Sequence, residues 1–206
     1  MADPSTLSAE WADPSGNAEG VANYTVVPPP GGYRACLPVT DPGFGCDWDY
    51  GWNSAQYAYQ QAAASAVAAS TLLAMRWWAD VETANSWTID DPLVAWSPTG
   101  ADVADLQGVM AGLAYARHRY ALAQPGAETL AMPATGIYTD ASSWTAIMGA
   151  TAAFSSQPAW LPGAGSEAQA ETNCTKVSPT RGQTMISQWT STVDYDYACP
   201  VPGQTY

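Results

Sequence analysis

The chain has 206 residues, of which 47% are hydrophobic, so it can bury a core the size of one ordinary domain. Nineteen acidic residues face six basic ones, and the net charge of −13 argues against nucleic acid and anionic membrane surfaces as partners. No apolar run reaches the roughly 18 residues that a membrane span requires. The first residues also lack the basic and apolar regions of a signal peptide.

The first fifty residues are rich in proline and glycine, and turns are expected at residues 13–16, 28–32 and 41–43. Only residues 24–27 resemble a strand. We therefore predict an irregular segment over residues 1–50, followed by one folded domain over residues 51–206.

The second part of the chain alternates helical and extended patterns. Helices are expected at 53–70, 100–121 and 141–149, and strands at 76–82, 134–139, 157–161 and 183–189. Strands that alternate with helices are typical of parallel β/α units, so the predicted fold class is α/β, either doubly wound or barrel-like. In both architectures functional side chains gather at the carboxyl ends of the strands.

The strand predicted at 76–82 ends in two acidic residues, Asp80 and Glu82. Alternation places both on one face, with Cα atoms roughly 7 Å apart, a separation at which two carboxylates can act on one glycosidic bond. Burial near Trp77, Trp78 and Trp87 would raise the pKa of Glu82 and favour it as the acid, while Asp80 stays ionised. The alternative is that this common pair only binds loop amides.

Other strand ends carry polar and aromatic side chains. Tyr138 and Asp140 follow one strand, and Gln188 and Trp189 end another. Asp194 and Asp196 are either a second carboxylate pair at a strand end or acids of a loop. The only histidine, His118, lies near the end of a helix between two arginines, which indicates a surface residue rather than a base. No metal site or cofactor fingerprint is expected.

The four cysteines form two local pairs at opposite ends of the chain. We predict disulfides Cys36–Cys46 and Cys174–Cys199, although three connectivities are open to four cysteines. Disulfides indicate an oxidising environment, and therefore a secreted or extracellular protein.

Four short motifs follow one another between residues 76 and 199: Asp80-Val81-Glu82, Gly136-Ile137-Tyr138-Thr139 with Trp144, Pro158-Ala159-Trp160, and Gln188-Trp189-Thr190 with Val193-Asp194. In this order they resemble glycoside hydrolase family 25 and the related glycoside-hydrolase-like domains of secreted bacterial proteins. The resemblance implies a β/α (TIM-type) barrel with muramidase activity on peptidoglycan. It also implies that the acetamido group of the substrate acts as the nucleophile.

The same resemblance assigns roles to individual residues. Glu82 would be the general acid, supported by Asp80 and Asp194. The side chains expected to contact the glycan are Trp87, Tyr138, Trp144, Gln188 and Trp189.

The chain also departs from the family pattern. The Gly-x-Asp-x-Ser strand that opens the family's barrel is missing, because Asp47 and Asp49 leave no room for the intervening β/α units before residue 76. Ser187 stands where the family has Trp, and Asp196 where it has Asn. We therefore predict a barrel that is incomplete at its N-terminal side. Two alternatives remain open, namely a catalytically incomplete glycan-binding domain and a secreted structural module.

Overall fold

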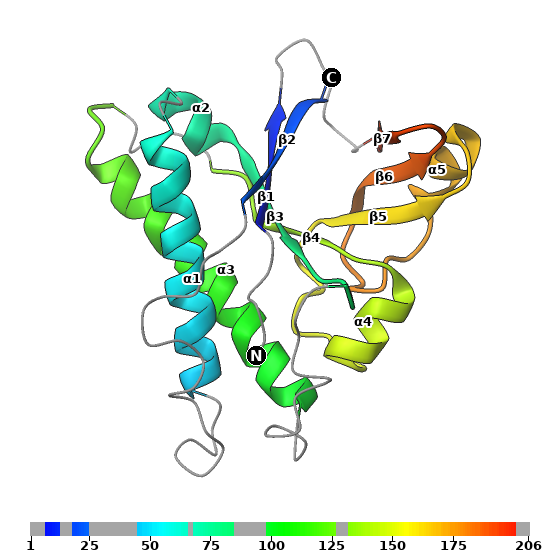
Figure 1. The fold of residues 1–206 in the computed structure, drawn as a ribbon, viewed down its shortest axis with the longest axis horizontal. Helices are drawn as coiled ribbons and strands as arrows, with labels where there is room; N and C mark the ends of the chain where they lie inside the picture. The colour runs from blue at the N-terminus through cyan, green and yellow to red at the C-terminus, as the bar shows by residue number, and fades with distance from the viewer. Residues whose placement is uncertain are drawn as a thin grey trace.

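The computed structural model describes residues 7–12, 18–24, 45–65, 68–84, 98–126 and 132–200. These residues form an α/β structure built on one seven-stranded sheet, with the strand order β2-β1-β3-β4-β5-β6-β7 (Figure 1). The strands are β1 (Leu7–Ala12), β2 (Ala18–Tyr24), β3 (Arg76–Asp80), β4 (Gly136–Tyr138), β5 (Ala159–Ala164), β6 (Thr184–Thr190) and β7 (Asp194–Ala198).

The centre of the sheet is parallel. Strands β3 to β6 run in the same direction, and each pairs with the next along the chain. The outer strands are antiparallel: β7 returns along β6, while β1 pairs with β3 and β2 pairs with β1. Together β3 to β7 form a curled sheet that resembles half of a barrel (Figure 1). This confirms the predicted α/β class.

The helices connect and cover the parallel strands. They are α1 (Gly45–Ala64), α2 (Ala69–Ala74), α3 (Pro98–Leu122), α4 (Ala141–Met148) and α5 (Glu167–Asn173). Two of the three short helices, α4 and α5, begin at capping side chains, Asp140 and Ser166, and both caps accept backbone N–H bonds. Helix α4 ends at Gly149, whose φ of 63° favours a residue without a Cβ.

Helices α1 and α3 pack very closely because glycines line their contact. A Cβ added at Gly108 would lie 2.0 Å from the Trp48 carbonyl oxygen, and one at Gly112 would lie 2.6 Å from that of Trp52. On α1, a Cβ at Gly51 would meet the backbone of Asp105. Any side chain at these positions would push the helices apart, so the glycines fix the interhelical distance.

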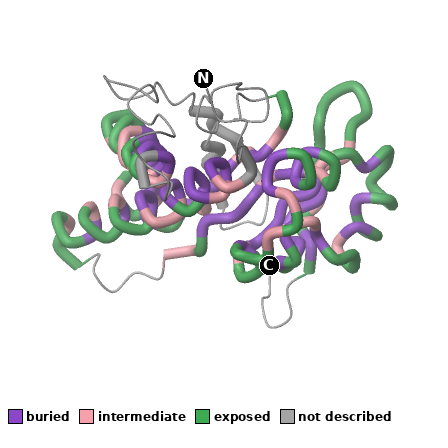
Figure 2. The backbone as a smooth tube through the Cα atoms, turned by 90° about the horizontal axis from the view of Figure 1, so that it is seen from below, coloured by how far each residue is buried: buried purple, intermediate pink, exposed green. Residues whose placement is uncertain are grey.

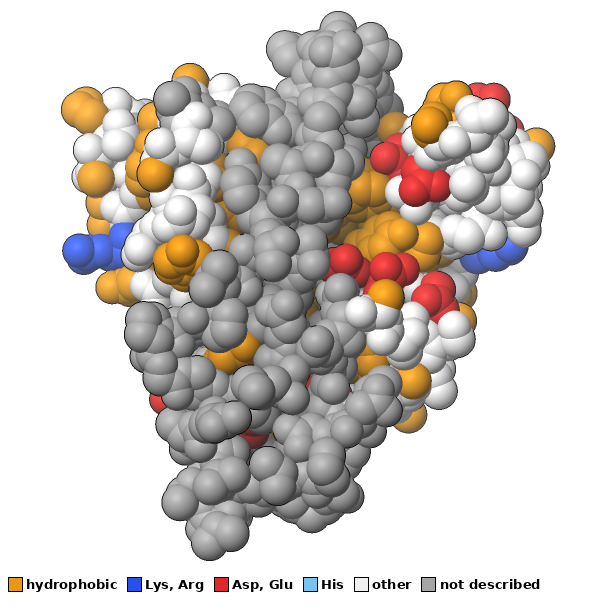
Figure 3. Space-filling model, in the orientation of Figure 1, with side chains coloured by type: hydrophobic (Ala, Val, Ile, Leu, Met, Phe, Trp, Pro, Cys, Tyr) orange, Lys and Arg blue, Asp and Glu red, His pale blue; other side chains and the backbone are white. Residues whose placement is uncertain are grey.

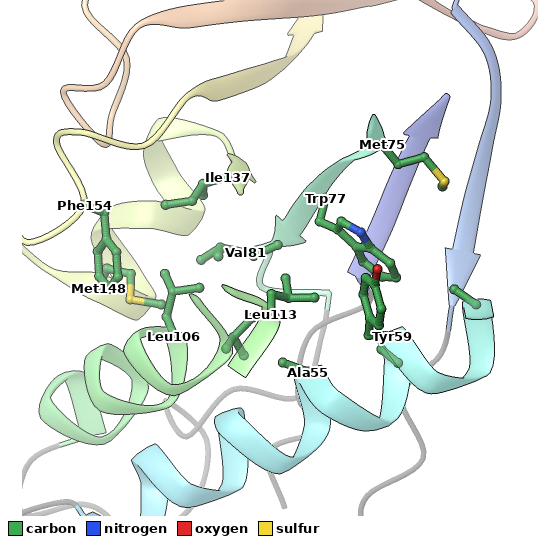
Figure 4. Packing of buried hydrophobic residues seen from close by; sticks show 14 of the residues in the cluster. Ala55, Tyr59, Met75, Trp77, Val81, Leu106, Leu113, Ile137, Met148 and Phe154 are labelled. Atoms are coloured by element: carbon green, nitrogen blue, oxygen red, sulfur yellow. The ribbon is translucent and has the colours of Figure 1, made fainter. Parts of the chain in front are cut away.

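The main core lies between these helices and one face of the sheet (Figure 4). Strand β3 supplies Trp77, which packs against Tyr59 of α1 with ring centroids 5.5 Å apart, and Val81 follows on the same face. Buried residues run along the sheet and along the facing sides of α1 and α3 (Figure 2). Burying these large side chains contributes about 1.5–3 kcal/mol each, so this layer fixes how β3 is oriented.

Most of the predicted elements are present with shifted bounds. The helix expected at 53–70 begins already at Gly45 and is followed by the separate helix α2. The strand expected at 183–189 is β6. Strands β1, β2 and β7 and helix α5 were not predicted as such, and the strand-like residues 24–27 share only Tyr24 with β2.

One of the two predicted disulfides is confirmed. Cys174, at the end of α5, is bonded to Cys199, just after β7, and therefore ties the last strand to the helix beside it. Cys36 and the side chain of Cys46 lie outside the described residues. Among the helices of the described ranges, none combines the length and apolar character that a membrane crossing requires.

Candidate functional site

The carboxyl ends of the parallel strands bring together the residues that the sequence singles out. Asp80 ends β3, Tyr138 ends β4, and Gln188 lies near the end of β6. Figure 3 shows acidic side chains on several sides of a recessed hydrophobic surface next to these strands. The recess lies on the concave face of the sheet, opposite the helices.

Strand β3 presents different side chains to its two faces. Trp77 and Ala79 belong to the helix-side core, whereas Trp78 packs with Trp160 and Ile186 in a second cluster on the concave face. Because side chains alternate along a strand, Asp80 lies on the same face as Trp78. The first carboxylate therefore adjoins an aromatic surface.

Glu82 follows just beyond the end of β3 and is held in place by its neighbours. The Val81 backbone N–H donates to the Tyr138 carbonyl oxygen at 2.9 Å, and the Thr139 hydroxyl donates to the Val81 carbonyl oxygen at 2.7 Å. These bonds keep the segment extended and Val81 in the core, so Glu82 points to the other side. Its partial burial, together with the negative charge of Asp140, raises its pKa.

Asp140 is the charged neighbour of Glu82. Its carboxylate accepts hydrogen bonds from the backbone N–H groups of Ser142 and Ser143, at 2.7 and 3.0 Å, and from both of their hydroxyl groups. Burial acts against ionisation, but these bonds outweigh it and lower the pKa of Asp140 to about 2. Asp140 is therefore fixed as an anion beside Glu82, and its charge adds to the effect of burial in raising the pKa of Glu82.

Tyr138 lies at the centre of the acidic groups. Its hydroxyl donates to Gln188 Oε1 at 3.0 Å, and its ring meets that of Trp160 edge to face at 5.1 Å. Burial and four carboxylates, those of Glu82, Asp80, Asp194 and Asp196, raise the pKa of Tyr138. All four acids thus act on one phenol group from two edges of the recess.

The pair Asp194 and Asp196 lies on strand β7, which settles the choice between a strand and a loop. Asp194 accepts a hydrogen bond from the Thr190 hydroxyl at 2.8 Å, and Asp196 pairs with Gln188 across the strands. Asp196 lies on an exposed strand, yet the partial desolvation of its carboxylate raises its pKa to about 6. The Trp160 indole opposes this shift and the charge of Asp194 adds to it.

Two of the predicted glycan contacts, Trp144 and Trp189, are not part of this group. Trp144 is 3% exposed and packs edge to face against Phe154 in the helix-side core. Trp189 lies on the face of β6 opposite Gln188, stacked on Tyr195 with ring centroids 4.5 Å apart. Trp87 lies outside the described residues. Tyr138 and Gln188 therefore remain as the predicted contacts that the structure brings together.

A separate cavity of about 300 Å³ lies at the opposite, amino ends of the strands. It is bordered by Arg117, whose guanidinium donates to the carbonyl oxygens of Pro133 and Leu73. These bonds tie α3 to the segments that enter β3 and β4. The cavity is thus distant from the carboxylates, and Arg117 has a structural role there.

Within the described ranges, no group of three or more His, Cys, Asp or Glu side chains is arranged to hold a metal ion. The arrangement can supply acid–base chemistry, because Glu82, whose pKa is raised, lies beside the ionised Asp140. The sequence places Asp140 at a strand end and leaves Asp196 open between a second carboxylate pair and a loop, but it gives neither of them, nor Trp160, a place among the expected catalytic or glycan-binding residues. Their position at strand ends was the only available signal.

The chain matches no protein-family model, no curated protein and no solved structure. The case for a function therefore rests on the site itself.

Proposed function

We propose that the chain is a glycoside-hydrolase-like domain that acts on bacterial cell-wall peptidoglycan, cutting the glycosidic bond as a muramidase does. The observation that carries the proposal is the pairing of Glu82, whose pKa is raised, with the ionised Asp140 at the carboxyl end of parallel strands. A carboxyl group with a raised pKa is suited to give its proton to a glycosidic oxygen.

The proposed reaction uses the substrate's acetamido group. Glu82 gives its proton to the leaving oxygen as the glycosidic C–O bond breaks, and the acetamido oxygen bonds to the anomeric carbon. Water then opens the resulting ring and returns a proton to Glu82. Asp80 and Asp194 would orient the acetamido group and stabilise the positive charge that develops, while Tyr138 and Gln188 would hold the sugar.

The fold that fits this proposal is a β/α barrel of TIM type that is incomplete at its N-terminal side. Support comes from the four parallel strands β3 to β6, with helices on the convex face and carboxylates at the carboxyl ends. The antiparallel strands β1 and β2 occupy the side of β3 where a complete barrel would continue with parallel strands.

A secreted or extracellular location fits the same proposal. The Cys174–Cys199 disulfide supports it, since such bonds persist in oxidising compartments.

A second candidate is a glycan-binding domain without catalysis. Trp144 and Trp189, two residues that the family resemblance assigns to the glycan, do not face the carboxylates, which favours a site that has lost part of the family's apparatus.

The decisive experiment is a turbidity assay on purified cell walls with the wild type and Glu82→Gln. If the proposal is right, the wild type lyses the walls, and the rate of lysis by Glu82→Gln is lower by at least about a hundredfold. Lysis that persists in Glu82→Gln would refute the assignment of the acid. Retention of the glycan without lysis in either protein would support the second candidate.

A further inference from the structure

The cavity at the amino ends of the strands contains a buried cation without a counter-charge. The Arg117 side chain is only 3% exposed. Its guanidinium donates to the backbone carbonyl oxygens of Pro133, Leu73 and Met75, at 2.5, 2.9 and 3.3 Å. These acceptors are uncharged, and within the described part of the chain Arg117 forms no ion pair. Because a buried charge is costly unless it is paired, an anion in the cavity would stabilise the protein.

The wall of the cavity also has hydrogen-bond donors that the protein does not use. A guanidinium has five N–H groups, and the three bonds of Arg117 leave two of them over. One of these is the buried Nε–H, which has no partner. The Thr135 hydroxyl and the Gln157 amide border the same cavity, and neither side chain makes a hydrogen bond to another described residue. Three side chains can therefore donate to one bound group.

The rest of the wall is apolar and leaves room for a small organic molecule. Met110, Met132 and Pro133 line it, and the flexible thioethers adapt to the shape of a ligand. The cavity measures about 300 Å³. Since a cavity of about 150 Å³ holds benzene, this one has space for roughly ten to twelve non-hydrogen atoms. Ala114 and Ala134 are exposed at its border, so the cavity is open to solvent.

The local charge favours an anion, in contrast to the chain as a whole. Arg76 donates to the Ala134 carbonyl oxygen at 3.2 Å, directly beside the Pro133 carbonyl that Arg117 binds. Two of the six basic residues of the chain thus converge on one short segment. None of the described residues that border the cavity is acidic. An anion is therefore attracted here even though the net charge of −13 repels anions elsewhere.

We propose that this cavity binds a small monocarboxylic acid with an apolar body. The Arg117 guanidinium pairs with the carboxylate, Thr135 and Gln157 donate to its oxygens, and the hydrocarbon part lies against Met110 and Met132. The site lies at the opposite ends of the strands from Glu82. The inference therefore does not depend on the proposed function, and binding is measured without any assay of lysis.

A titration followed by NMR tests the inference on the whole chain. The ¹⁵N-labelled protein is titrated with 3-phenylpropionate and with 3-phenylpropanamide, which has the same shape and no charge. We expect the backbone amide signals of Ala114, Arg117 and Thr135 to shift, and the carboxylate to bind about tenfold more tightly than the amide. Equal binding of the two probes, binding of neither, or shifts confined to the recess around Tyr138 would overturn the inference.

Two further probes test the apolar part of the site. Acetate and inorganic phosphate are anions without a hydrocarbon body, so each should bind at least about tenfold more weakly than 3-phenylpropionate. Equal binding of either one would mean that the cavity attracts any anion, and this would refute the proposed ligand class.

A variant that fills the cavity locates the bound probe. Ala114→Leu adds an apolar side chain at the border of the cavity and should weaken binding of 3-phenylpropionate at least about tenfold. Ala168→Leu makes the same change at an exposed position of α5 and should leave binding unchanged. Unaltered binding by Ala114→Leu, or an equal loss in Ala168→Leu, would refute the site.

Variants of the donors test how the charge is recognised. Arg117→Gln should abolish the preference for the carboxylate over the amide, whereas Arg119→Gln removes an exposed charge from the same helix and should preserve it. If Arg117→Gln does not fold, Thr135→Val decides the matter, because it removes one donor with little change in shape and should reduce the preference about threefold. A preference that is unchanged in Thr135→Val and in any folded Arg117→Gln, or that is lost equally in Arg119→Gln, would overturn the inference.

Discussion

The Tyr138 hydroxyl donates a hydrogen bond to Gln188 across strand β5, which separates β4 from β6 in the sheet. Two strands apart, the backbones of a flat sheet lie roughly 9.5 Å from each other, so the two side chains must lean together over the strand between them. The curvature of the sheet turns them towards each other. The hydrogen bond therefore indicates that the sheet is curved strongly enough to form a recess on its concave face.

Loss of the Tyr138–Gln188 hydrogen bond should lower the stability of the protein without unfolding it. We expect Tyr138→Phe to lower the free energy of unfolding by about 0.5–1.5 kcal/mol, since Gln188 keeps access to water. Chemical denaturation measures the change. In a double-mutant cycle with Gln188→Ala the two effects should not be additive. Full additivity would mean that the bond does not form in solution.

The charge of Asp140 should extend towards alkaline pH the range in which Glu82 holds its proton, in addition to the larger effect of burial. Asp140→Asn removes the anion that raises the pKa of Glu82, so Glu82 should lose its proton at lower pH. The alkaline limb of the lysis–pH profile would then move towards acid. Asparagine still caps helices well, so α4 should persist, and circular dichroism verifies this. If the alkaline limb of the lysis–pH profile did not move, the ionisation of Glu82 would not be what limits lysis at high pH.

The buried Asp105 should make the protein less stable as the pH rises. Burial and the nearby charges of Asp102 and Asp47 raise the pKa of Asp105 well above its usual range. Between the unfolded pKa, about 4, and this raised value the folded state binds more protons than the unfolded state, so stability falls with increasing pH.

Asp105→Asn should therefore increase the free energy of unfolding at pH 7 by about 1 kcal/mol or more, and flatten its dependence on pH above 4. Denaturation curves at several pH values between 4 and 8 provide the measurement. A variant that is less stable than the wild type at pH 7 would show that the ionised carboxylate has a favourable role.

The glycine contacts between α1 and α3 predict a steric penalty. Gly108→Ala places a Cβ against the Trp48 backbone, and we expect a loss of about 1–3 kcal/mol of stability despite the better helix propensity of alanine. Gln107→Ala, at the neighbouring exposed position, is the matched control and should change stability by less than about 0.5 kcal/mol. Similar values for both variants would contradict the close packing.

The Cys174–Cys199 disulfide should hold β7 against the rest of the sheet. Replacing both cysteines by alanine releases a loop of 25 residues and should cost about 3 kcal/mol of stability. Hydrogen exchange should accelerate in β7 more than in β4, because β7 pairs with a strand on one side only. Uniform acceleration across both strands would indicate that the disulfide stabilises the domain as a whole.

The periodicity of apolar residues predicts the β/α core because each of its helices and strands has the apolar spacing typical of its own secondary structure. The stripe on α3 and the extended runs around Ile137 and Trp160 follow the expected spacing closely. Strands β1 and β2 escape prediction because they contain small and polar residues, and because β1 is paired by β3, which lies more than fifty residues later, while β2 pairs only with β1. The early start of α1 is missed because its glycines reflect packing against α3 rather than helix propensity.

The candidate site was only partly predictable for similar reasons. Because side chains alternate along a strand, Trp189 and Gln188 must lie on opposite faces of β6. The spacing of Ser143, Trp144, Ile147 and Met148 is that of one buried helix face. These two patterns show that Trp144 and Trp189 do not face the recess. The proximity of Asp140 to Glu82, by contrast, depends on how β4 lies beside β3, and no local pattern contains it.

Strand β3 carries both the core and the candidate site on its two faces, and this limits how the protein can change over evolution. Its side chains can be exchanged singly, because Trp77 and Asp80 meet different surroundings. Its length cannot change. One residue gained or lost between Trp77 and Asp80 would reverse the face on which Asp80 lies and would direct its carboxylate into the helix-side core. We therefore expect descendants of this sequence to vary in composition here but never in spacing.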